Sequence, residues 1–345
     1  MAETVHSSNT VVPENILHGG DLDAARAAFP GAPEPWLDLS TGINPWSYPI
    51  PAIPIEAWTR LPGRAADEAL RAAAVACYGA PSAAHVVAAA GSQALIQVLP
   101  RLRPLGRVAV LGPTYAEHAR GWSAAGHAVA EVRRLEEADG ADVVVIVNPN
   151  NPDGRVVPAA VLLDLARRQA ARGGWLVVDE AFADAMPEVS MAAEADRPGL
   201  VVLRSFGKFF GLAGVRLGFA LGRPELADAV RRGVGPWAVS GPALAVGAAA
   251  LSDRAWIETM RQRLVAETSA LDVHLQRMDL SVSGGTPLFR LVTHDRAQDY
   301  HRAFGRAGIL VRRFPEHPGW LRMGLPPDEA ARERLAQAGK PGAKE

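Results

Sequence analysis

Four short and almost wholly apolar runs recur through the middle of the chain. The runs are Val108–Leu111, Val143–Val147, Trp175–Asp179 and Leu200–Leu203. Continuous Val, Ile and Leu without alternation is typical of strands that are covered on both faces. Helix-like segments lie between them, for example Ala116–Ala125 and Ala159–Arg172. This order of strand and helix predicts an α/β fold around a mostly parallel, doubly wound sheet.

The pattern changes beyond Leu221, where glycine and proline become frequent. A long helix is predicted from Ala243 onward, and short strands with one helix are predicted between Leu280 and Leu325. We therefore expect a large α/β domain over residues 36–234 and a small α+β domain over residues 235–336. An N-terminal arm (1–35) and a disordered tail (337–345) complete the predicted organisation.

Polar or glycine-containing residues follow each of the four predicted strands. These segments are Gly112–Tyr115, Asn148–Asn151, Asp179–Glu180 and Ser205–Lys208. In open α/β sheets, ligands bind beyond the carboxyl ends of the strands. The sequence therefore predicts one site that all four segments share.

Lysine is nearly absent from the chain. Of the 36 Lys and Arg residues, only Lys208, Lys340 and Lys344 are lysines, and the last two lie in the predicted tail. An amine can lose its proton and form a Schiff base, whereas the guanidinium of arginine stays charged. Lys208 is therefore a candidate catalytic residue. The alternative is a surface lysine in a glycine-containing loop.

Composition and charge indicate whether the protein binds nucleic acid or a membrane, and in which cellular compartment it works. A net charge of -1 gives no basis for nucleic-acid binding. No apolar stretch is long enough to cross a hydrocarbon core of ~30 Å, and the N-terminus has no signal-peptide pattern. The single cysteine, Cys77, cannot form an internal disulfide, which fits a reducing compartment. We expect a soluble, cytoplasmic protein.

Two segments are candidates for binding a phosphate group. Ser205 lies three residues before Lys208 and Arg216 lies eight residues after it, so that both could hold a phosphate while the amine reaches an aldehyde. Gly91–Ala94 precedes a predicted helix, and a small-residue turn of this kind offers backbone N–H groups to an anion. A plain strand-to-helix turn is the alternative. The segment matches neither the dinucleotide-binding nor the Walker pattern.

Three further polar or aromatic residues lie at predicted strand ends. Asp179 could pair with a protonated ring nitrogen of a cofactor, or it could be a helix cap or a metal ligand. No His at ligand spacing supports a metal. Tyr115 could stack on a flat ring, or it could simply be packed. Asn151 belongs to an Asn-Pro-Asn-Asn-Pro turn, which could be a purely structural turn.

The chain resembles the fold-type I pyridoxal-phosphate enzymes, the aspartate aminotransferase superfamily, through an ordered set of motifs. The set consists of Gly91–Gln93, Tyr115, Asn148–Pro152, Asp179–Ala181, Ser205–Lys208 and Arg216. The resemblance extends over about residues 35–330. It implies that Lys208 forms a Schiff base with pyridoxal 5′-phosphate, that Asp179 pairs with the ring nitrogen and that Tyr115 stacks on the ring. It also implies a homodimer, with Asn151 at the ring oxygen and the cofactor phosphate bound by Ser92, Gln93, Ser205 and Arg216.

Two further regions narrow the resemblance. Gly308–Phe314 and Gly319–Arg322 are similar to the histidinol-phosphate aminotransferase branch, in which an arginine matching Arg322 binds the substrate α-carboxylate. Taken alone, Arg322 could equally be a surface arginine. His18–Asp21 and Leu37–Pro45 resemble the L-threonine-O-3-phosphate decarboxylases of cobalamin synthesis. Those enzymes remove CO2 from threonine phosphate and form (R)-1-amino-2-propanol O-2-phosphate for the nucleotide loop of the corrinoid.

This narrower resemblance implies a small phosphorylated amino acid as substrate. The expected substrate-binding residues are His18, Gly19, Gly20, Ser40, Asn44, Asn151 and Arg322. In pyridoxal-phosphate enzymes the Cα bond perpendicular to the cofactor ring is the one that breaks, so orientation decides between decarboxylation and transamination. We expect Arg322 to hold the carboxylate out of the ring plane, and the arm around His18–Gly20 and Ser40–Asn44 to bind the substrate phosphate. His18 could instead be a turn histidine.

Two other functions share the same cofactor residues. The first is a histidinol-phosphate-type aminotransferase that uses 2-oxoglutarate, and the second is a non-enzymatic pyridoxal-phosphate-binding protein. The sequence also departs from the family at two positions. Phe182 stands where the aminotransferases have a tyrosine that donates to the ring oxygen, and Leu61 stands where a tyrosine approaches the cofactor of the neighbouring subunit.

Overall fold

The computed structural model describes residues 18–339. The first 17 residues of the predicted arm and residues 340–345 of the predicted tail lie outside the described residues. The α-helices are α1 Leu22–Ala28, α2 Ile55–Thr59, α3 Arg64–Tyr78, α4 Ser92–Val98, α5 Glu117–Ala124, α6 Ala159–Ala171, α7 Phe206–Phe209, α8 Pro224–Val234, α9 Gly241–Ser252, α10 Arg254–Arg277, α11 Ala297–Arg306 and α12 Glu329–Ala338. The strands are β1 Leu37–Asp38, β2 Val86–Ala89, β3 Arg107–Leu111, β4 Ala128–Val132, β5 Val143–Val147, β6 Trp175–Asp179, β7 Leu200–Ser205, β8 Gly218–Leu221, β9 Ser281–Thr286, β10 Phe289–Thr293, β11 Ile309–Leu310, β12 Arg312–Arg313 and β13 Trp320–Gly324.

A seven-stranded sheet forms the centre of the larger part of the molecule. Its strand order is β2-β8-β7-β6-β5-β3-β4, and β8 is antiparallel to both of its neighbours while the other pairs are parallel. All four predicted strands are present, as β3, β5, β6 and β7. The predicted α/β fold with a mostly parallel sheet is therefore confirmed.

Both faces of this sheet are covered by helices, which explains why its strands are apolar throughout. Along β5, Val144 and Ile146 pack into the core that α3, α6, α9 and α10 complete. Val143 and Val145 point to the other face, where residues of α4, α5 and α8 form a second core. Burying alternate Val side chains on opposite faces removes the polar face that a half-exposed strand would show.

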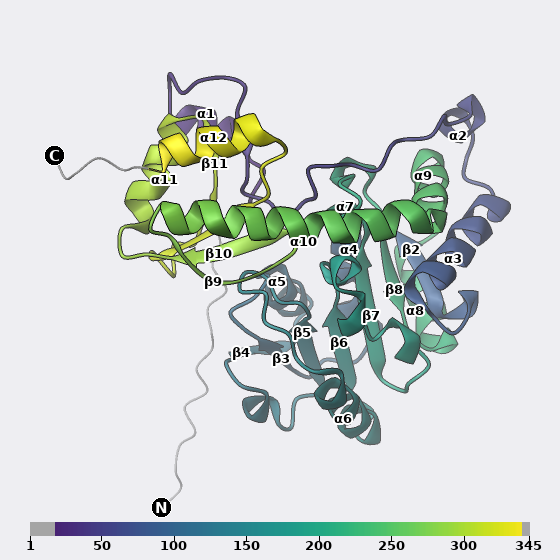
Figure 1. Cartoon of the computed structure of the whole chain (residues 1–345). Helices are drawn as coiled ribbons and strands as arrows, with labels where there is room; N and C mark the ends of the chain where they lie inside the picture. The colour runs from purple at the N-terminus through teal and green to yellow at the C-terminus, as the bar shows by residue number, and fades with distance from the viewer. Residues whose placement is uncertain (1–17, 340–345) are drawn as a thin grey trace, which may run out of the picture.

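A smaller antiparallel sheet, in the order β12-β13-β10-β9, lies beyond the central sheet. Figure 1 shows α10 extending from α9 and α3 at one end of the molecule to this smaller sheet at the other. The long helix predicted from Ala243 is in fact two helices, because Asp253 ends α9 and caps α10 by accepting a hydrogen bond from the backbone N–H of Trp256 at 3.0 Å. The predicted short strands and single helix between Leu280 and Leu325 are all present.

The segment before α2 joins the two parts of the molecule. Strand β1 pairs in parallel with β11 of the smaller part, and the chain then crosses to the α7 region of the larger part. At the C-terminal end, α12 includes Gln337 and Ala338, which the sequence placed in the tail. No helix within residues 18–339 is long and apolar enough to cross a membrane.

Candidate active site

A cavity of about 460 Å³ opens at the carboxyl ends of the central strands, where the polar segments converge. Its volume falls within the range of small-molecule sites. Eleven predicted site residues line it: His18, Gly19, Ser92, Gln93, Tyr115, Asn151, Asp179, Ser205, Lys208, Arg216 and Arg322. Three predicted substrate residues do not line it: Gly20, Ser40 and Asn44. The structure thus brings together residues that are more than three hundred positions apart in the sequence, His18 and Arg322.

Lys208 lies on α7, a single helical turn that directly follows the central strand β7. Within residues 18–339, no side chain forms a hydrogen bond or an ion pair with its amine. Burial, with a smaller contribution from the guanidinium of Arg322, lowers the pKa of Lys208 to about 8. The amine can therefore take up and release a proton near neutral pH.

Ser92, Ser205 and Arg216 converge on one end of the cavity. Neither serine hydroxyl has a hydrogen-bond partner among the described residues, and Arg216 donates only a long bond of 3.4 Å to the carbonyl of Ala213. The guanidinium lies over Gly91, where an added Cβ would be 2.9 Å from Nη2. Arg216 itself has a left-handed backbone with φ 55°. Two hydroxyls without partners among the described residues and a guanidinium are groups that can bind an anion.

Asp179 is the last residue of strand β6, and the imidazole of His118 holds its carboxylate in place. His118 Nε2 lies 2.7 Å from Asp179 Oδ2, and both side chains are buried. The other carboxylate oxygen accepts a hydrogen bond from the backbone N–H of Ala181 at 3.0 Å. Asp179 is therefore fixed in orientation while it lines the cavity.

A hydrogen-bonded chain along one wall joins Tyr115, Gln93 and Glu117, and His18 lies within ion-pair distance of Glu117. The hydroxyl of Tyr115 donates to Gln93 Oε1 at 3.1 Å, and Gln93 Nε2 donates to Glu117 Oε2 at 3.1 Å. His18 Nε2 lies 3.2 Å from Glu117 Oε1. Burial raises the pKa of Tyr115 to about 12, so its hydroxyl keeps its proton. Gln93 uses its side chain within this chain, which leaves its backbone N–H as the group available to an anion.

Arg322 enters the cavity from β13 of the smaller sheet and is buried, with 7% of its surface exposed. It donates through Nη1 to Asn151 Oδ1 and through Nη2 to the carbonyl of Ser40 at 2.8 Å, while Nε has no partner. No acidic side chain of residues 18–339 is within ion-pair distance of it. Burial lowers its pKa to about 9. The negative charge of Asp38 partly opposes this shift, but it forms no ion pair with Arg322, so the buried guanidinium can still pair with an anionic ligand.

The two positions that depart from the family lie in different surroundings. Phe182 lines the cavity and packs edge-to-face on Phe289, with ring centroids 5.0 Å apart. Leu61 is exposed just beyond α2. Phe182 thus contributes an apolar wall where a tyrosine would bring a hydroxyl.

Sequence reasoning missed His118 and Glu117, although a signal for both was present. They begin the helix that follows Tyr115, at the same edge of the sheet as the other site residues. Two ionisable residues at the start of a helix beside a strand end were therefore candidates for supporting the site.

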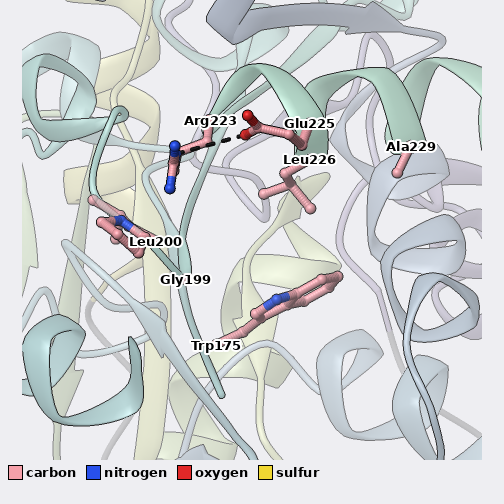
Figure 2. A pocket seen from close by; sticks show the side chains of 8 residues that line it. Trp175, Gly199, Leu200, Arg223, Glu225, Leu226 and Ala229 are labelled. Atoms are coloured by element: carbon pink, nitrogen blue, oxygen red, sulfur yellow. Dashed lines mark ion pairs between the residues drawn. The ribbon is translucent and has the colours of Figure 1, made fainter. Parts of the chain in front are cut away.

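A second hollow, on the side where β6 and β7 begin, has a different character. Figure 2 shows that Trp175, Leu200 and Leu226 line it beside the ion pair of Arg223 and Glu225, whose charged atoms are 3.6 Å apart. It contains no nucleophile and no unpaired acid. In addition, no three His, Cys, Asp or Glu side chains within residues 18–339 are grouped so as to hold a metal ion.

The residues that line the main cavity fit the cofactor that the resemblance implies. Pyridoxal phosphate requires a free amine for its aldehyde, an acid for its ring nitrogen and an anion site for its phosphate. Lys208 supplies an unpaired amine, Asp179 a fixed carboxylate, and the Ser92, Ser205 and Arg216 group the anion site. All three features open into one cavity.

Comparisons with known proteins find similar sequences over most of the chain. The model of the family aminotransferase class I and II matches residues 55–338. A threonine-phosphate decarboxylase of Pseudomonas aeruginosa is 51% identical over 326 residues, which cover 94% of this chain and 97% of that protein. A threonine-phosphate decarboxylase of a Sinorhizobium species is 46% identical over 329 residues, with the same two coverages of 94% and 97%.

A solved structure supports the fold. The histidinol-phosphate aminotransferase of Sinorhizobium meliloti, in complex with pyridoxal 5′-phosphate, has a TM-score of 0.79 and covers 97% of both chains. Its sequence identity of 20% makes this a likeness of fold alone.

Proposed function

The chain belongs to the aminotransferase class I and II family, and on that premise we propose that it decarboxylates L-threonine O-3-phosphate with pyridoxal 5′-phosphate as cofactor. The products are CO2 and (R)-1-amino-2-propanol O-2-phosphate. The observation that carries the proposal is the buried Arg322, a cation without an acidic partner in the same cavity as the free amine of Lys208. Relatives at 51% and 46% identity over nearly the whole chain support the choice of substrate.

The cofactor, when bound, supplies an electron sink for the electron pair that remains on the substrate Cα when CO2 departs. The phosphate of the cofactor would be bound by Ser92, Ser205 and Arg216. Asp179 would hold a proton between its carboxylate and the ring nitrogen, and His118 keeps that carboxylate in place at 2.7 Å. Lys208, with its pKa lowered to about 8, would hold and move a proton at Nζ.

The carboxylate and the phosphate of the substrate would bind in different parts of the cavity. Arg322 would bind the α-carboxylate, because it is the buried cation beside Lys208 and Asn151. His18 and Gly19 line the outer part of the cavity and would contact the substrate phosphate. Two fixed ends orient the molecule at its Cα, which is how a site selects the bond that breaks.

A direct assay separates this proposal from the aminotransferase alternative. Purified protein loaded with pyridoxal phosphate is expected to release CO2 from threonine phosphate without any added 2-oxo acid. Histidinol phosphate with 2-oxoglutarate, offered in parallel, is expected to give no glutamate. Glutamate formation that depends on 2-oxoglutarate, together with no CO2, would contradict the decarboxylase assignment. A protein that stays colourless after addition of the cofactor would contradict both enzyme assignments.

The homodimer that the resemblance implies is part of the proposal. Around α2 the chain exposes four large apolar side chains, Ile50 (61%), Ile55 (66%), Trp58 (63%) and Leu61 (68%). A patch of this kind is typical of a protein–protein interface. We propose that a second copy of the chain covers this patch. A cytoplasmic location and a role in making the nucleotide loop of corrinoids complete the proposal, and the lone Cys77 fits a reducing compartment.

The substitution Trp58→Glu is expected to weaken the dimer, because it places a charge in the centre of the apolar patch. Loss of one central aromatic residue raises a dimer dissociation constant by roughly 30-fold or more. Sedimentation equilibrium over a range of protein concentrations measures this constant. Leu105→Glu, at another exposed apolar residue (69%), is the matched control and is expected to leave the constant unchanged. Equal constants for wild type and Trp58→Glu would exclude this patch from the interface.

A further inference from the structure

Residues 37–48, which we call the strap, connect the two sides of the active site. The N–H of Leu37 donates to the carbonyl of Gly308 at 2.9 Å, and that of Leu39 donates to Leu310 at 2.8 Å. The carbonyl of Leu39 accepts from the N–H of Gly324 at 2.7 Å, at the end of β13. The first part of the strap is therefore fixed to the smaller sheet that carries Arg322.

Ser40 ties the strap to Arg322 itself. Its backbone carbonyl accepts the 2.8 Å hydrogen bond from Arg322 Nη2. Its hydroxyl donates to Asp38 Oδ1 at 2.6 Å and accepts from the N–H of Gly20 at 2.7 Å. The side chain of Ser40 is thus fully engaged within the strap and the arm, and its carbonyl holds the guanidinium.

Asn44 ties the other end of the strap to α7. Its backbone N–H donates to the carbonyl of Lys208 at 2.9 Å, and its side-chain Nδ2 donates to the carbonyl of Phe209 at 2.8 Å. Its Oδ1 accepts from the N–H of Trp46 at 2.9 Å, and only 1% of the residue is exposed. Because the last carbonyls of a helix lack partners within the helix, these two bonds complete the short turn that carries the amine.

Between these two ends, the strap packs closely against two aromatic rings at Gly42. At Gly42, an added Cβ would lie 2.8 Å from Phe182 Cε1 and 2.9 Å from Phe289 Cδ1. Beyond Asn44, the N–H of Tyr48 donates to the carbonyl of Phe210 at 2.9 Å. Five residues, from Ser40 to Asn44, therefore connect the carbonyl that binds Arg322 to the turn that carries Lys208.

We propose that Asn44 is a positioning residue, which holds the backbone of Lys208 in register with Arg322 through the strap. The side chain of Asn44 forms no hydrogen bond with the amine of Lys208 or the guanidinium of Arg322, and it does not line the cavity. The proposal rests on the proposed function, in which Lys208 and Arg322 act on the same small substrate. An error of ~1 Å between two groups that act together can lower a rate by ~100-fold.

Asn44→Ala removes both side-chain bonds and keeps the backbone bond to Lys208. We expect kcat for threonine phosphate to fall by roughly 10- to 100-fold, while KM changes by less than about threefold. Asn44→Asp, which retains an acceptor for Trp46 but loses the donor to Phe209, is expected to show the same fall in kcat. Ser47→Ala is the matched control, because it removes another strap hydrogen bond to the same region, 2.9 Å to the carbonyl of Gly211, from an exposed side chain. It is expected to behave as wild type.

A second measurement requires neither cofactor nor substrate. In the full chain without cofactor, carbon-13 labelling of lysine gives three side-chain signals, because the chain has three lysines. The Lys208 signal is expected to titrate near pH 8 in wild type and in Ser47→Ala. In both Asn44 variants its midpoint is expected to rise toward the ordinary value, because a loosened α7 admits water to the amine. A purely structural role for Asn44 would lower the melting temperature without moving this midpoint.

The possible outcomes distinguish a failure of the proposed function from a failure of the positioning role of Asn44. If wild type releases no CO2 from threonine phosphate, the proposed function fails, and the lysine titration still tests Asn44. If wild type is active and both Asn44 variants match Ser47→Ala in kcat and in the Lys208 midpoint, the positioning role is overturned. A rise in KM with unchanged kcat would also overturn it, because that result indicates direct substrate binding by Asn44.

Discussion

Replacing Lys208 by alanine is expected to lower kcat for threonine phosphate by at least about 10⁴-fold, because the change removes both the amine that binds the cofactor and the group that moves the proton. Its unpaired amine, with a pKa lowered to about 8, is what suits Lys208 to both tasks. Rapid-quench measurement of CO2 release gives the rate. The absorption spectrum of the protein after gel filtration shows whether the cofactor is still covalently held.

Two variants make this result specific. Lys208→Arg keeps a positive charge that cannot be lost, so it is expected to be as inactive as Lys208→Ala. Lys344→Ala removes a different lysine and is expected to retain full activity. If Lys208→Arg kept a tenth or more of the wild-type rate, the role of residue 208 would be electrostatic and the covalent assignment would be wrong.

Arg322→Gln is expected to lower kcat/KM for threonine phosphate by roughly 30- to 4,000-fold, which corresponds to about 2–5 kcal/mol for loss of one member of a buried charge pair. The physical reason is the isolation of Arg322, which is 7% exposed and hydrogen-bonded only to neutral oxygens of Asn151 and Ser40. The substrate carboxylate would supply the ion pair that Arg322 lacks among residues 18–339. Steady-state kinetics over a range of substrate concentrations measures the loss.

The product supplies the control for this variant. (R)-1-Amino-2-propanol O-2-phosphate lacks the carboxylate, so its inhibition constant is expected to be nearly the same in wild type and Arg322→Gln. The melting temperature without ligand is not expected to fall, because the change removes a buried charge that has no acidic partner among the described residues. Equal weakening of substrate and product would place Arg322 at the phosphate end of the substrate.

The central sheet and most of the cavity could be predicted because their signals are local. Val143–Val147 has no polar residue, and a strand of that kind needs cover on both faces. Asp179 ends β6 and Lys208 follows β7, and because these two strands are neighbours in the sheet, the closeness of the two residues follows from the topology. The break between α9 and α10 was missed, although Ser252 and Asp253 are typical helix-capping residues.

The strap could not be predicted in this way, because its contacts depend on long-range geometry. Asn44 is separated from Phe209 by 165 residues and Ser40 from Arg322 by 282 residues. The motif around Ser40 and Asn44 indicated importance, and substrate binding was the expected reason. In the structure both side chains are engaged with the protein itself, outside the cavity lining. The sequence motif therefore indicates that these two positions matter, but it does not show which groups their side chains contact.

The left-handed backbone at Arg216 lowers the stability of the fold, whereas its side chain is needed for the proposed function. A residue with a Cβ loses roughly 1–2 kcal/mol in that conformation, whereas glycine adopts it freely. Glycine at position 216 would therefore relieve the strain, and it would also remove the guanidinium that lines the cavity together with Ser92 and Ser205. Directed evolution for heat resistance alone would reward that exchange. A selection scheme for this protein therefore has to score catalysis in every round.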